Sequence, residues 1–274
     1  MVLVVGAIYF SGCAKSSNTS GDGGVAGAGG VCVPEKDLLV SGIVGGNVVQ
    51  SSASDSKNAI MILSDKNQLC TSTALSRTVL LTAAHCLSDA SKAVALTSST
   101  LSCESGFDVT VNQIKARKLV VHEDYSSDIS AGDSANDVAL VFLEKPLPSS
   151  YPIFSIADLT TLTKENSLYL WGFGEINNNS GGDGQLRKTQ ISADDYSINN
   201  DMKKVVIDQS SGHGICHGDS GGAAFVKQDG QLKILGVNSY VVGPEGSGLC
   251  NGKAYLTLAT EYQAWIQKQI YLNK

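Results

Sequence analysis

Three short strings of this sequence carry residue types that together can perform nucleophilic catalysis. His85 stands in the string LTAAHC, Asp137 in NDVAL and Ser220 in GDSGG. A serine hydroxyl becomes a good nucleophile when a base removes its proton, and a neutral histidine can do this near neutral pH. A buried carboxylate can hold the imidazole in the right tautomer. Taken singly, each residue also fits an ordinary structural role, such as a turn-capping aspartate or a strand-end histidine.

The glycines around Ser220 add a second chemical function to that string. Gly218 and Gly221 place the serine on a tight turn whose backbone N–H groups can point inward. Such donors stabilise the oxyanion of an acyl-transfer reaction, typically by about 2.7–4 kcal/mol each. A Cβ atom at these positions would obstruct either the turn or the substrate, so glycine meets both demands.

The elements that must position these residues read as short β-strands. The chain has 29 glycines among its 274 residues, and turn-forming residues separate its apolar runs. Apolar positions repeat with helical spacing over residues 258–272. Many short strands followed by one terminal helix favour two β-barrels over a sandwich. The predicted strands cover residues 59–63, 68–74, 77–82, 109–121, 138–143, 168–172, 204–207, 223–226 and 234–240.

The three strings, in the order His, Asp and Ser, resemble those of the trypsin-like serine peptidases, which have the chymotrypsin fold. The resemblance covers nearly all of residues 43–274 and extends to WGFG at 171–174, SY at 239–240 and YQAWI at 262–266. HEDY at 122–125 is similar to the family's HPxY segment, with glutamate in place of proline. The resemblance implies an all-β peptidase domain of two six-stranded antiparallel β-barrels with a C-terminal α-helix, and an active site between the barrels.

The resemblance also implies a role for each of these residues. His85 would act as general base and then general acid, with Asp137 orienting it, while Ser220 would form the acyl-enzyme. The N–H groups of Gly218 and Ser220 would form the oxyanion hole. A peptide or protein substrate would add as a strand alongside the segment that begins at Ser239, so main-chain hydrogen bonds would supply sequence-independent binding.

The stretch SGIVGG contains a predicted maturation site. In the family that the sequence resembles, the residue matching Ile43 becomes a new N-terminus, and its ammonium pairs with the aspartate beside the nucleophile, here Asp219. The resemblance therefore implies a zymogen that is activated by cleavage between Gly42 and Ile43. Gly45 and Gly46 would let the new terminus bend inward. Since Gly42 stands where digestive relatives have Lys or Arg, trypsin should not perform this cleavage.

The resemblance further locates the pocket for P1, the substrate residue that precedes the cleaved bond. Its base falls on Gly214, which lacks the carboxylate that a Lys or Arg side chain would need. Val241, which follows Tyr240 on the substrate-binding strand, would narrow the pocket and favour small aliphatic residues. Lys253 and His217 leave open an alternative in which acidic P1 residues are accepted. A solvent-directed side chain is the other interpretation of Lys253.

The resemblance implies two disulfides. Cys70 and Cys86 match the family's bridge beside the catalytic histidine, and Cys216 and Cys250 match the bridge that frames the specificity pocket. A disulfide of this kind typically stabilises a fold by about 2–4 kcal/mol.

The overall composition excludes several functional classes. A net charge of −6 and an isoelectric point near 5.2 argue against nucleic-acid binding. The seven cysteines include no CxxC pair, so the spacing of zinc sites is absent and structural disulfides in an exported protein are expected. We expect no cofactor and no metal site, and we expect a monomer.

The N-terminal region predicts export and a tether. Residues 1–13 resemble a bacterial lipoprotein signal, because an apolar run too short to span a bilayer ends at Ser-Gly-Cys13; a plain cleaved signal is the alternative. Residues 14–42 read as a flexible tether and propeptide. With Cys13 lipidated, Cys32 and Cys103 remain, and we predict that they pair; two unrelated thiols are the alternative. The protein would be secreted, or membrane-anchored on the periplasmic or outer surface of a bacterium.

A catalytically inactive homologue that acts as a surface binding protein is the competing functional hypothesis. Such homologues usually lack the histidine, the aspartate or the serine, whereas this chain retains all three. An active, secreted serine endopeptidase is therefore the function that the sequence favours.

Overall fold

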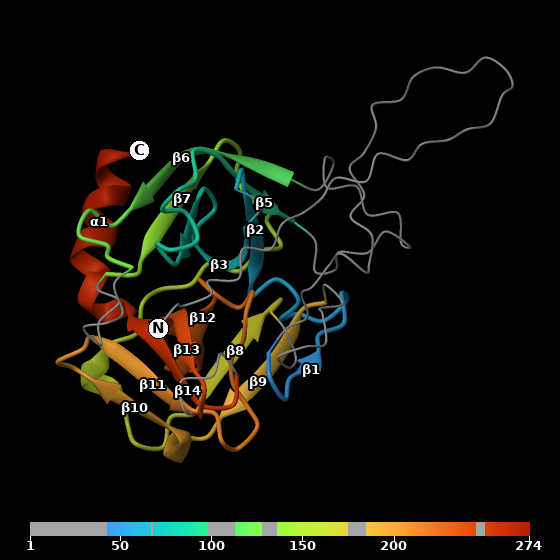
Figure 1. Cartoon of the computed structure of the whole chain (residues 1–274). Coiled ribbons are helices and arrows are strands. Elements are labelled where there is room, and N and C mark those ends of the chain that lie inside the picture. Colours follow the sequence, from blue (N-terminus) through green and yellow to red (C-terminus); the bar gives the residue numbers. More distant parts are fainter. Residues whose placement is uncertain (1–42, 67, 98–112, 128–135, 175–184, 245–249) are drawn as a thin grey trace, which may run out of the picture.

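The computed structural model describes residues 43–66, 68–97, 113–127, 136–174, 185–244 and 250–274. The predicted signal and tether, with Cys13 and Cys32, lie in residues 1–42, and Cys103 lies in residues 98–112, so these predictions fall outside the described residues. The described chain forms a β-barrel and a curled β-sheet, and the C-terminal helix lies beside the barrel (Figure 1).

The first half of the chain closes into a six-stranded antiparallel barrel with the order β2-β3-β4-β7-β6-β5. Every residue of β7, with the sequence ALVFL, is buried, and β7 pairs with the equally buried β4. Continuous apolar runs of this kind are typical of strands that are covered on both faces. The strands are β2 (Ile60–Ser64), β3 (Leu69–Ser76), β4 (Val79–Thr82), β5 (Ala93–Leu96), β6 (Gln113–Val121) and β7 (Ala139–Leu143).

The second half of the chain, together with β1 from near the start of the described chain, forms an eight-stranded antiparallel sheet with the order β1-β9-β8-β12-β13-β14-β11-β10. This corrects a detail of the predicted six-stranded second barrel, because β1 and β10 extend the six central strands at the two edges. Both additions are short segments without a strong apolar pattern. The predicted all-β, chymotrypsin-type architecture is confirmed. The strands are β1 (Asn47–Val48), β8 (Leu168–Gly172), β9 (Arg187–Ile191), β10 (Tyr196–Asn199), β11 (Lys204–Asp208), β12 (Ala223–Gln228), β13 (Gln231–Val242) and β14 (Lys253–Leu258).

Most predicted elements appear close to their expected bounds. Each predicted strand overlaps an observed one, whereas the short β5 and the polar β9 were missed, together with β1, β10 and β14. Asp229 and Gly230 join β12 to β13, and their φ values of 53° and 74° are those that a tight hairpin requires. The predicted terminal helix divides into a 3-10 turn and α1. The helical segments are η3 (Leu159–Thr161), η4 (Ala193–Asp195), η6 (Ala259–Tyr262) and α1 (Gln263–Leu272).

An aromatic cluster joins the sheet to the segment that connects the two halves of the chain. Phe225 of β12 is buried, with its ring centroid 4.6 Å from that of Phe154 and 5.5 Å from that of Trp171. Tilted and edge-on contacts at such distances stabilise aromatic pairs beyond the area that they bury. The strands that carry the candidate site residues therefore rest on a well-packed core.

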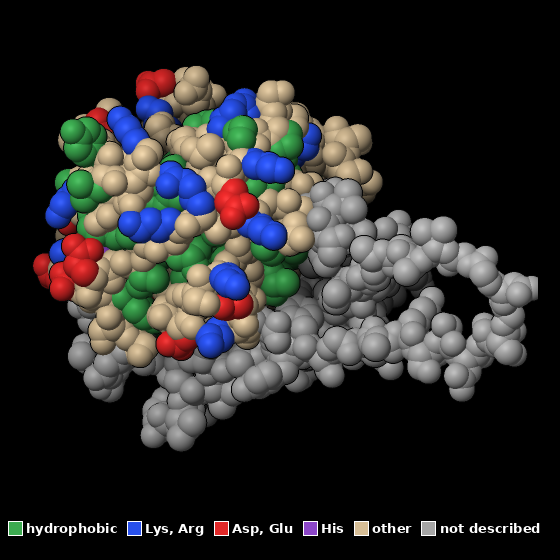
Figure 2. Space-filling view, turned by 90° about the horizontal axis from the view of Figure 1, so that it is seen from above, with side chains coloured by type: hydrophobic (Ala, Val, Ile, Leu, Met, Phe, Trp, Pro, Cys, Tyr) green, Lys and Arg blue, Asp and Glu red, His purple; other side chains and the backbone are tan. Residues whose placement is uncertain are grey.

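The surface is predominantly polar where Figure 2 shows it. Lys and Arg side chains are spread over this face with Asp and Glu between them, and hydrophobic side chains reach it among the charged ones. In the described part of the chain, no helix has the length and apolar character needed to cross a membrane.

Replacing Phe225 with alanine should destabilise the folded domain by about 3–5 kcal/mol, because it removes a fully buried ring and leaves a cavity between its aromatic neighbours. Urea unfolding of the purified domain measures this change. Leu272→Ala is the matched control, since Leu272 is 61% exposed and its loss should change stability by less than about 0.5 kcal/mol. Equal effects of the two substitutions would contradict the described core.

Candidate active site

His85 and Asp137 meet because the strands that lead to them are paired. β4 ends at Thr82 and β7 begins at Ala139, and these two residues are partners in the β4–β7 ladder. His85 follows the end of β4 and Asp137 precedes β7, so both lie at the same edge of the barrel. The Nδ1 atom of His85 lies 2.8 Å from Oδ2 of Asp137, and the backbone N–H of His85 donates to Oδ1 at 2.9 Å.

The charges of this pair support each other. Burial of the imidazole acts to lower the pKa of His85, but the negative charge of Asp137 and the hydrogen bond to it raise the pKa above its ordinary value. Burial likewise acts to raise the pKa of Asp137, but His85 and the hydrogen bonds to the carboxylate lower it to about 2. The aspartate therefore stays ionised while its partner can take up a proton near neutral pH.

The Asp137 carboxylate also reaches across to the second half of the domain. Ser239 of β13 donates a hydrogen bond from its Oγ to Asp137 Oδ2. The preceding residue, Asn136, has a left-handed φ of 61° and is held by the hydroxyl of Tyr262, which donates to its Oδ1 at 3.0 Å. Asn136 Nδ2 in turn donates to the carbonyl of Asp124 at 2.9 Å. The position of Asp137 thus depends on β13 and on the C-terminal helical segment.

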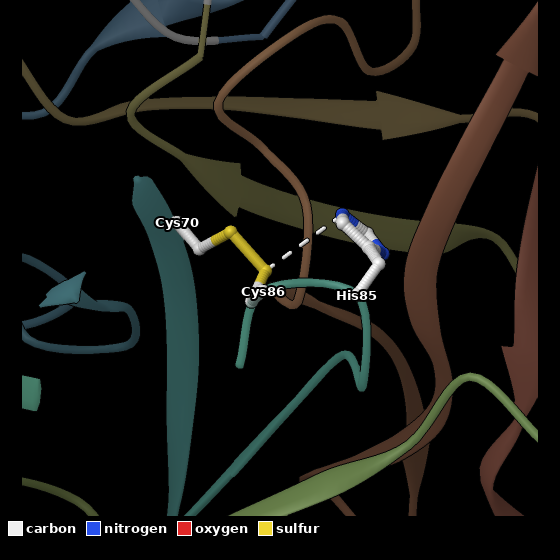
Figure 3. A group of neighbouring side chains, drawn as sticks. All are labelled: Cys70, His85 and Cys86. Carbon is white, nitrogen blue, oxygen red and sulfur yellow. Dashed lines mark hydrogen bonds between the residues drawn. A yellow bond between two sulfur atoms is a disulfide. The ribbon is translucent and has the colours of Figure 1, made fainter. Parts of the chain in front are cut away.

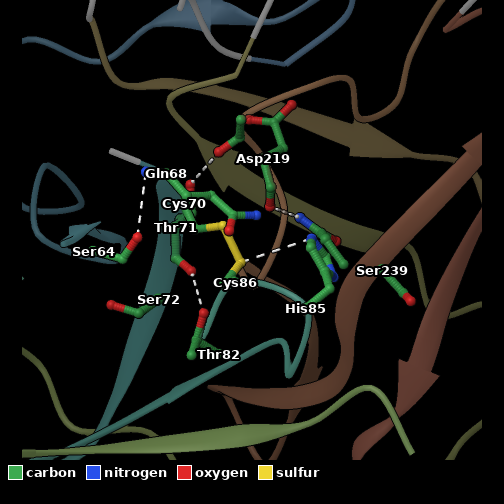
Figure 4. Close-up of a disulfide and its surroundings, with 12 residues drawn as sticks. Ser64, Gln68, Cys70, Thr71, Ser72, Thr82, His85, Cys86, Asp219 and Ser239 are labelled. Atoms are coloured by element: carbon green, nitrogen blue, oxygen red, sulfur yellow. Dashed lines mark hydrogen bonds between the residues drawn. A yellow bond between two sulfur atoms is a disulfide. The ribbon is translucent and has the colours of Figure 1, made fainter. Parts of the chain in front are cut away.

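Segments from both halves of the domain hold the turn that carries Ser220. Thr71 of β3 donates from its N–H to the Ser220 carbonyl at 2.8 Å and from its hydroxyl to the Gly218 carbonyl at 3.0 Å. Asn238 of β13 accepts from the Gly221 N–H at 2.8 Å. Thr82 Oγ1 donates to the Thr71 carbonyl, and Figure 4 shows this bond beside the Cys70–Cys86 bridge and His85.

Position 221 requires glycine both because of its backbone conformation and because of the close approach of neighbouring atoms. Its φ is 80°, and a Cβ atom there would lie 2.1 Å from Thr82 Oγ1 and 2.4 Å from the Thr71 carbonyl oxygen. No side chain fits at such distances, so the turn can approach β3 and β4 only with glycine at this position.

Two backbone N–H groups of this turn have no acceptor within the described protein. The N–H groups of Gly218 and Ser220 make no hydrogen bond among the described residues, whereas those of Cys216, Asp219 and Gly221 all donate. Gly218 is buried and has a φ of 92°. Buried N–H groups are nearly always paired in folded proteins, so these two are available to an oxygen of a bound molecule.

The imidazole of His85 lies between Asp137 and a disulfide. Its Nε2 atom is 3.7 Å from Cys86 Sγ (Figure 3). Among the described contacts, no hydrogen bond joins His85 to Ser220. Catalytic hydrogen bonds of this kind are often long in the absence of substrate and tighten when it binds.

Both disulfides that the resemblance implied are present. Cys70 is bonded to Cys86 and Cys216 to Cys250. Each bridge has a histidine beside it, but sulfur atoms that are bonded to each other are not the thiolates that coordinate metal ions. These two groups of residues are therefore structural bridges and not metal sites.

Asp219 precedes Ser220 and holds the start of the described chain. The backbone nitrogen of Ile43, which is fully buried, lies 3.3 Å from Asp219 Oδ2. The same carboxylate accepts from the N–H groups of Cys216 at 2.9 Å and Gly174 at 2.7 Å. Gly45 has a left-handed φ of 64°, a conformation that favours glycine.

The predicted pocket residues lie on two neighbouring segments. Gly214 is buried and its N–H donates to the carbonyl of Val44 at 3.1 Å, while His217 is exposed beside the Cys216–Cys250 bridge. On β13, Tyr240 and Val241 are half-buried. The ring of Tyr240 stacks on the ring of Tyr255 from β14, and the two ring centroids are 4.7 Å apart.

Lys253 lies at the exposed start of β14. It is in register with Asp208 of β11 and Val242 of β13. Hydrogen bonds from Ser210 and, to a smaller extent, the charge of Lys253 lower the pKa of Asp208. This lysine therefore has a carboxylate neighbour within the protein.

Two buried polar residues near the site were not predicted from the sequence. Lys204 is 1% exposed and donates to Thr257 Oγ1 at 3.1 Å, and its charge acts to lower the pKa of His85. Gln209 is fully buried behind Gly214. Lys204 is the first residue of the apolar run KVVI, and a charged residue in such a run is a sequence signal for a buried polar contact. No local pattern of the sequence indicates that Gln209 is buried.

Two features of this structure are typical of the chymotrypsin-fold serine peptidases. A β-barrel and a curled sheet both bond the turn that carries Ser220, and a buried aspartate is paired with a histidine. The family model described as Trypsin matches residues 43–266. The chain therefore belongs to the trypsin family and is a serine endopeptidase, a hydrolase that acts on peptide or protein substrates.

Similar proteins have names that agree with this family. The rat "Chymotrypsin-like elastase family member 1" (Rattus norvegicus) is 26% identical over 244 residues, which cover 83% of this chain and 89% of the relative. The bovine protein of the same name (Bos taurus) is 26% identical over 247 residues, with coverage of 84% and 90%. "Serine protease SP24D" of Anopheles gambiae is 26% identical over 233 residues, with coverage of 82% and 80%.

His85 should titrate above its ordinary pKa of 6.5, because the charge of Asp137 outweighs the burial of the ring. In Asp137→Asn that charge is lost while burial remains, so the His85 pKa should fall below 6.5. NMR titration of the histidine ring protons measures both values. His122 is the internal control: burial lowers its pKa, and the substitution should leave it unchanged. A His85 pKa that does not respond would contradict the described pair.

Proposed function

We propose that this serine endopeptidase acts through His85, Asp137 and Ser220. The observation that carries the proposal is the ionised, buried Asp137 carboxylate, which bonds the His85 ring at Nδ1 and accepts a second hydrogen bond from the backbone N–H of His85. With Nδ1 bonded to the aspartate, Nε2 is the nitrogen that can accept the serine proton. The available N–H groups of Gly218 and Ser220 support the assignment of the oxyanion hole.

The chemistry follows from these positions. Ser220 Oγ attacks the carbonyl carbon of the scissile bond while its proton passes to His85 Nε2, and the carbonyl electron pair moves to the oxygen. That oxyanion accepts hydrogen bonds from the N–H groups of Gly218 and Ser220. Collapse of the intermediate breaks the C–N bond, the amine leaves with the proton from His85, and an acyl group remains on Ser220. Water then attacks that ester by the same route and releases the acid.

We further propose a preference for small aliphatic P1 residues. Gly214 offers no negative charge for a Lys or Arg side chain, and Val241 of the half-buried substrate-binding strand supplies a branched wall. The alternative preference for acidic P1 residues requires the Lys253 side chain to point into the pocket. Its exposed position opposite Asp208 supports the solvated interpretation and favours small residues.

The proposed route to the active form is cleavage between Gly42 and Ile43. In the intact chain the Ile43 nitrogen at Asp219 is an amide, and the φ of Ile43 is 48°, an unfavourable value for a β-branched residue. Cleavage would remove that constraint and convert the donor into an ammonium. Breaking a buried ion pair typically costs about 3–5 kcal/mol, so the new pair would strongly favour the ordered turn.

Export remains part of the proposal. The two disulfides fit an extracellular protein. A lipidated Cys13 would tether the precursor to a membrane, and cleavage at Gly42 would release the peptidase domain unless a Cys32–Cys103 bridge retained it.

A fluorophosphonate probe should label the processed wild-type protein at Ser220, because only an activated serine reacts with it. Ser220→Ala should abolish labelling and reduce peptidase turnover by about 10⁶-fold, the usual cost of removing such a nucleophile. Labelling is followed by mass spectrometry and turnover with a peptide-library substrate. Processed wild-type protein that takes no label would instead support the inactive binding homologue.

Asp219→Asn should abolish activity in the processed protein and leave the fold intact, because the new terminus loses its charged partner. In the processed wild type, Asp219 should raise the pKa of the Ile43 ammonium above the unpaired value of about 7.7–8.0. The ordered site is then kept below that raised pKa and lost as pH rises through it, so kcat/KM should decline at alkaline pH. Circular dichroism checks the fold, and full activity of Asp219→Asn would rule out the switch.

A further inference from the structure

Gln209 is a buried side chain whose polar groups are all in use. It follows β11 and is fully buried. Its Oε1 accepts from the N–H of Ile215 at 2.6 Å, while its Nε2 donates to the carbonyls of Ile215 at 3.1 Å and Cys250 at 2.8 Å. Its own N–H donates to the Gly252 carbonyl at 2.8 Å.

These bonds join two segments that are far apart in the sequence. Ile215 belongs to the segment that leads through Cys216 to the nucleophile turn, and Cys250 belongs to the segment that leads into β14. The disulfide Cys216–Cys250 links the same two segments. The carboxamide is therefore a second, non-covalent link between the predicted walls of the P1 pocket.

The same carboxamide takes the space into which a side chain at Gly214 would point. A Cβ atom at Gly214 would lie 1.9 Å from Gln209 Oε1, 2.3 Å from its Cδ and 2.6 Å from its Cγ. Gly214 is the predicted base of the pocket. Gln209 thus occupies the volume into which a side chain at that base would extend.

We propose that Gln209 sets the depth of the P1 pocket and thereby restricts the enzyme to small P1 residues. This inference rests on the proposed function and deepens it. A long P1 side chain would have to displace the carboxamide, and that would leave the Ile215 and Cys250 carbonyls without a donor. A substrate that leaves buried polar groups of the site without hydrogen-bond partners is strongly disfavoured.

The test compares kcat/KM for a peptide series that differs only at P1, with Ala, Val, Leu and Phe. Wild type should favour Ala and Val. In Gln209→Ala the ratio of the Leu to the Ala value should rise by about tenfold or more, the usual effect of a few methylene groups in such a pocket. Active-site titration with the fluorophosphonate corrects each value for the folded, competent fraction.

Gln228→Ala is the matched control. Gln228 is also a buried glutamine, with its Oε1 bonded to the Asp158 N–H and its Nε2 to the Asp158 carbonyl and Thr161 Oγ1. It lies at the end of β12, away from the predicted pocket, so its loss should lower stability without changing the P1 ratio. A ratio that rises equally in both variants would overturn the proposal.

A second variant separates the space-filling effect of the Gln209 side chain from the effect of its hydrogen bonds. Gln209→Met keeps the length of the side chain but not its hydrogen bonds, so it should lower stability and keep the wild-type P1 preference. If Gln209→Ala does not fold, the proposal stands or falls on Gln209→Met and on wild type: wild type that prefers Leu or Phe to Ala would overturn it. Unlabelled wild type contradicts the proposed catalytic site, whereas labelled Gln209→Ala with an unchanged ratio contradicts the pocket inference alone.

Discussion

The buried carboxylate of Asp137 is the interaction on which the arrangement of this site depends. A buried charge is stable only when donors surround it, and here the donors come from His85 in the barrel and Ser239 in the second sheet. The two halves of the domain must therefore meet at one relative position for the charge to be satisfied. That position also brings β3 and β13 to the two sides of the turn that carries Ser220.

A second buried carboxylate, Asp219, organises the other side of the turn. It collects N–H groups from Ile43, Gly174 and Cys216, which belong to three separate segments. The two carboxylates differ in what they hold: Asp137 orients the imidazole side chain of His85, whereas Asp219 orients backbone N–H groups. A change at Asp137 should therefore act on the pKa of His85, and a change at Asp219 on the geometry of the turn.

The sequence predicted much of this organisation because its strongest signals are local. LTAAHC and NDVAL each join a buried strand to a polar residue, and pairing of those strands brings His85 and Asp137 together. The long apolar strands could be predicted for the same reason. Thr71, Asn238 and Gln209 were not, because each acts by bonding a segment distant in the chain, and no local pattern records such a partner. The edge strands β1 and β10 escaped prediction since tertiary pairing and not their composition defines them.

The hydrogen bonds from Thr71 to the Ser220 turn have a consequence for the biosynthesis of the protein. Thr71 lies in the first half of the chain and the turn in the second, while Asn238, still later, holds the other side. No partially synthesised or half-folded chain can present this serine correctly, because its supports come from both halves. The geometry around Ser220 is therefore a property of the completed tertiary structure, which either half of the chain alone lacks.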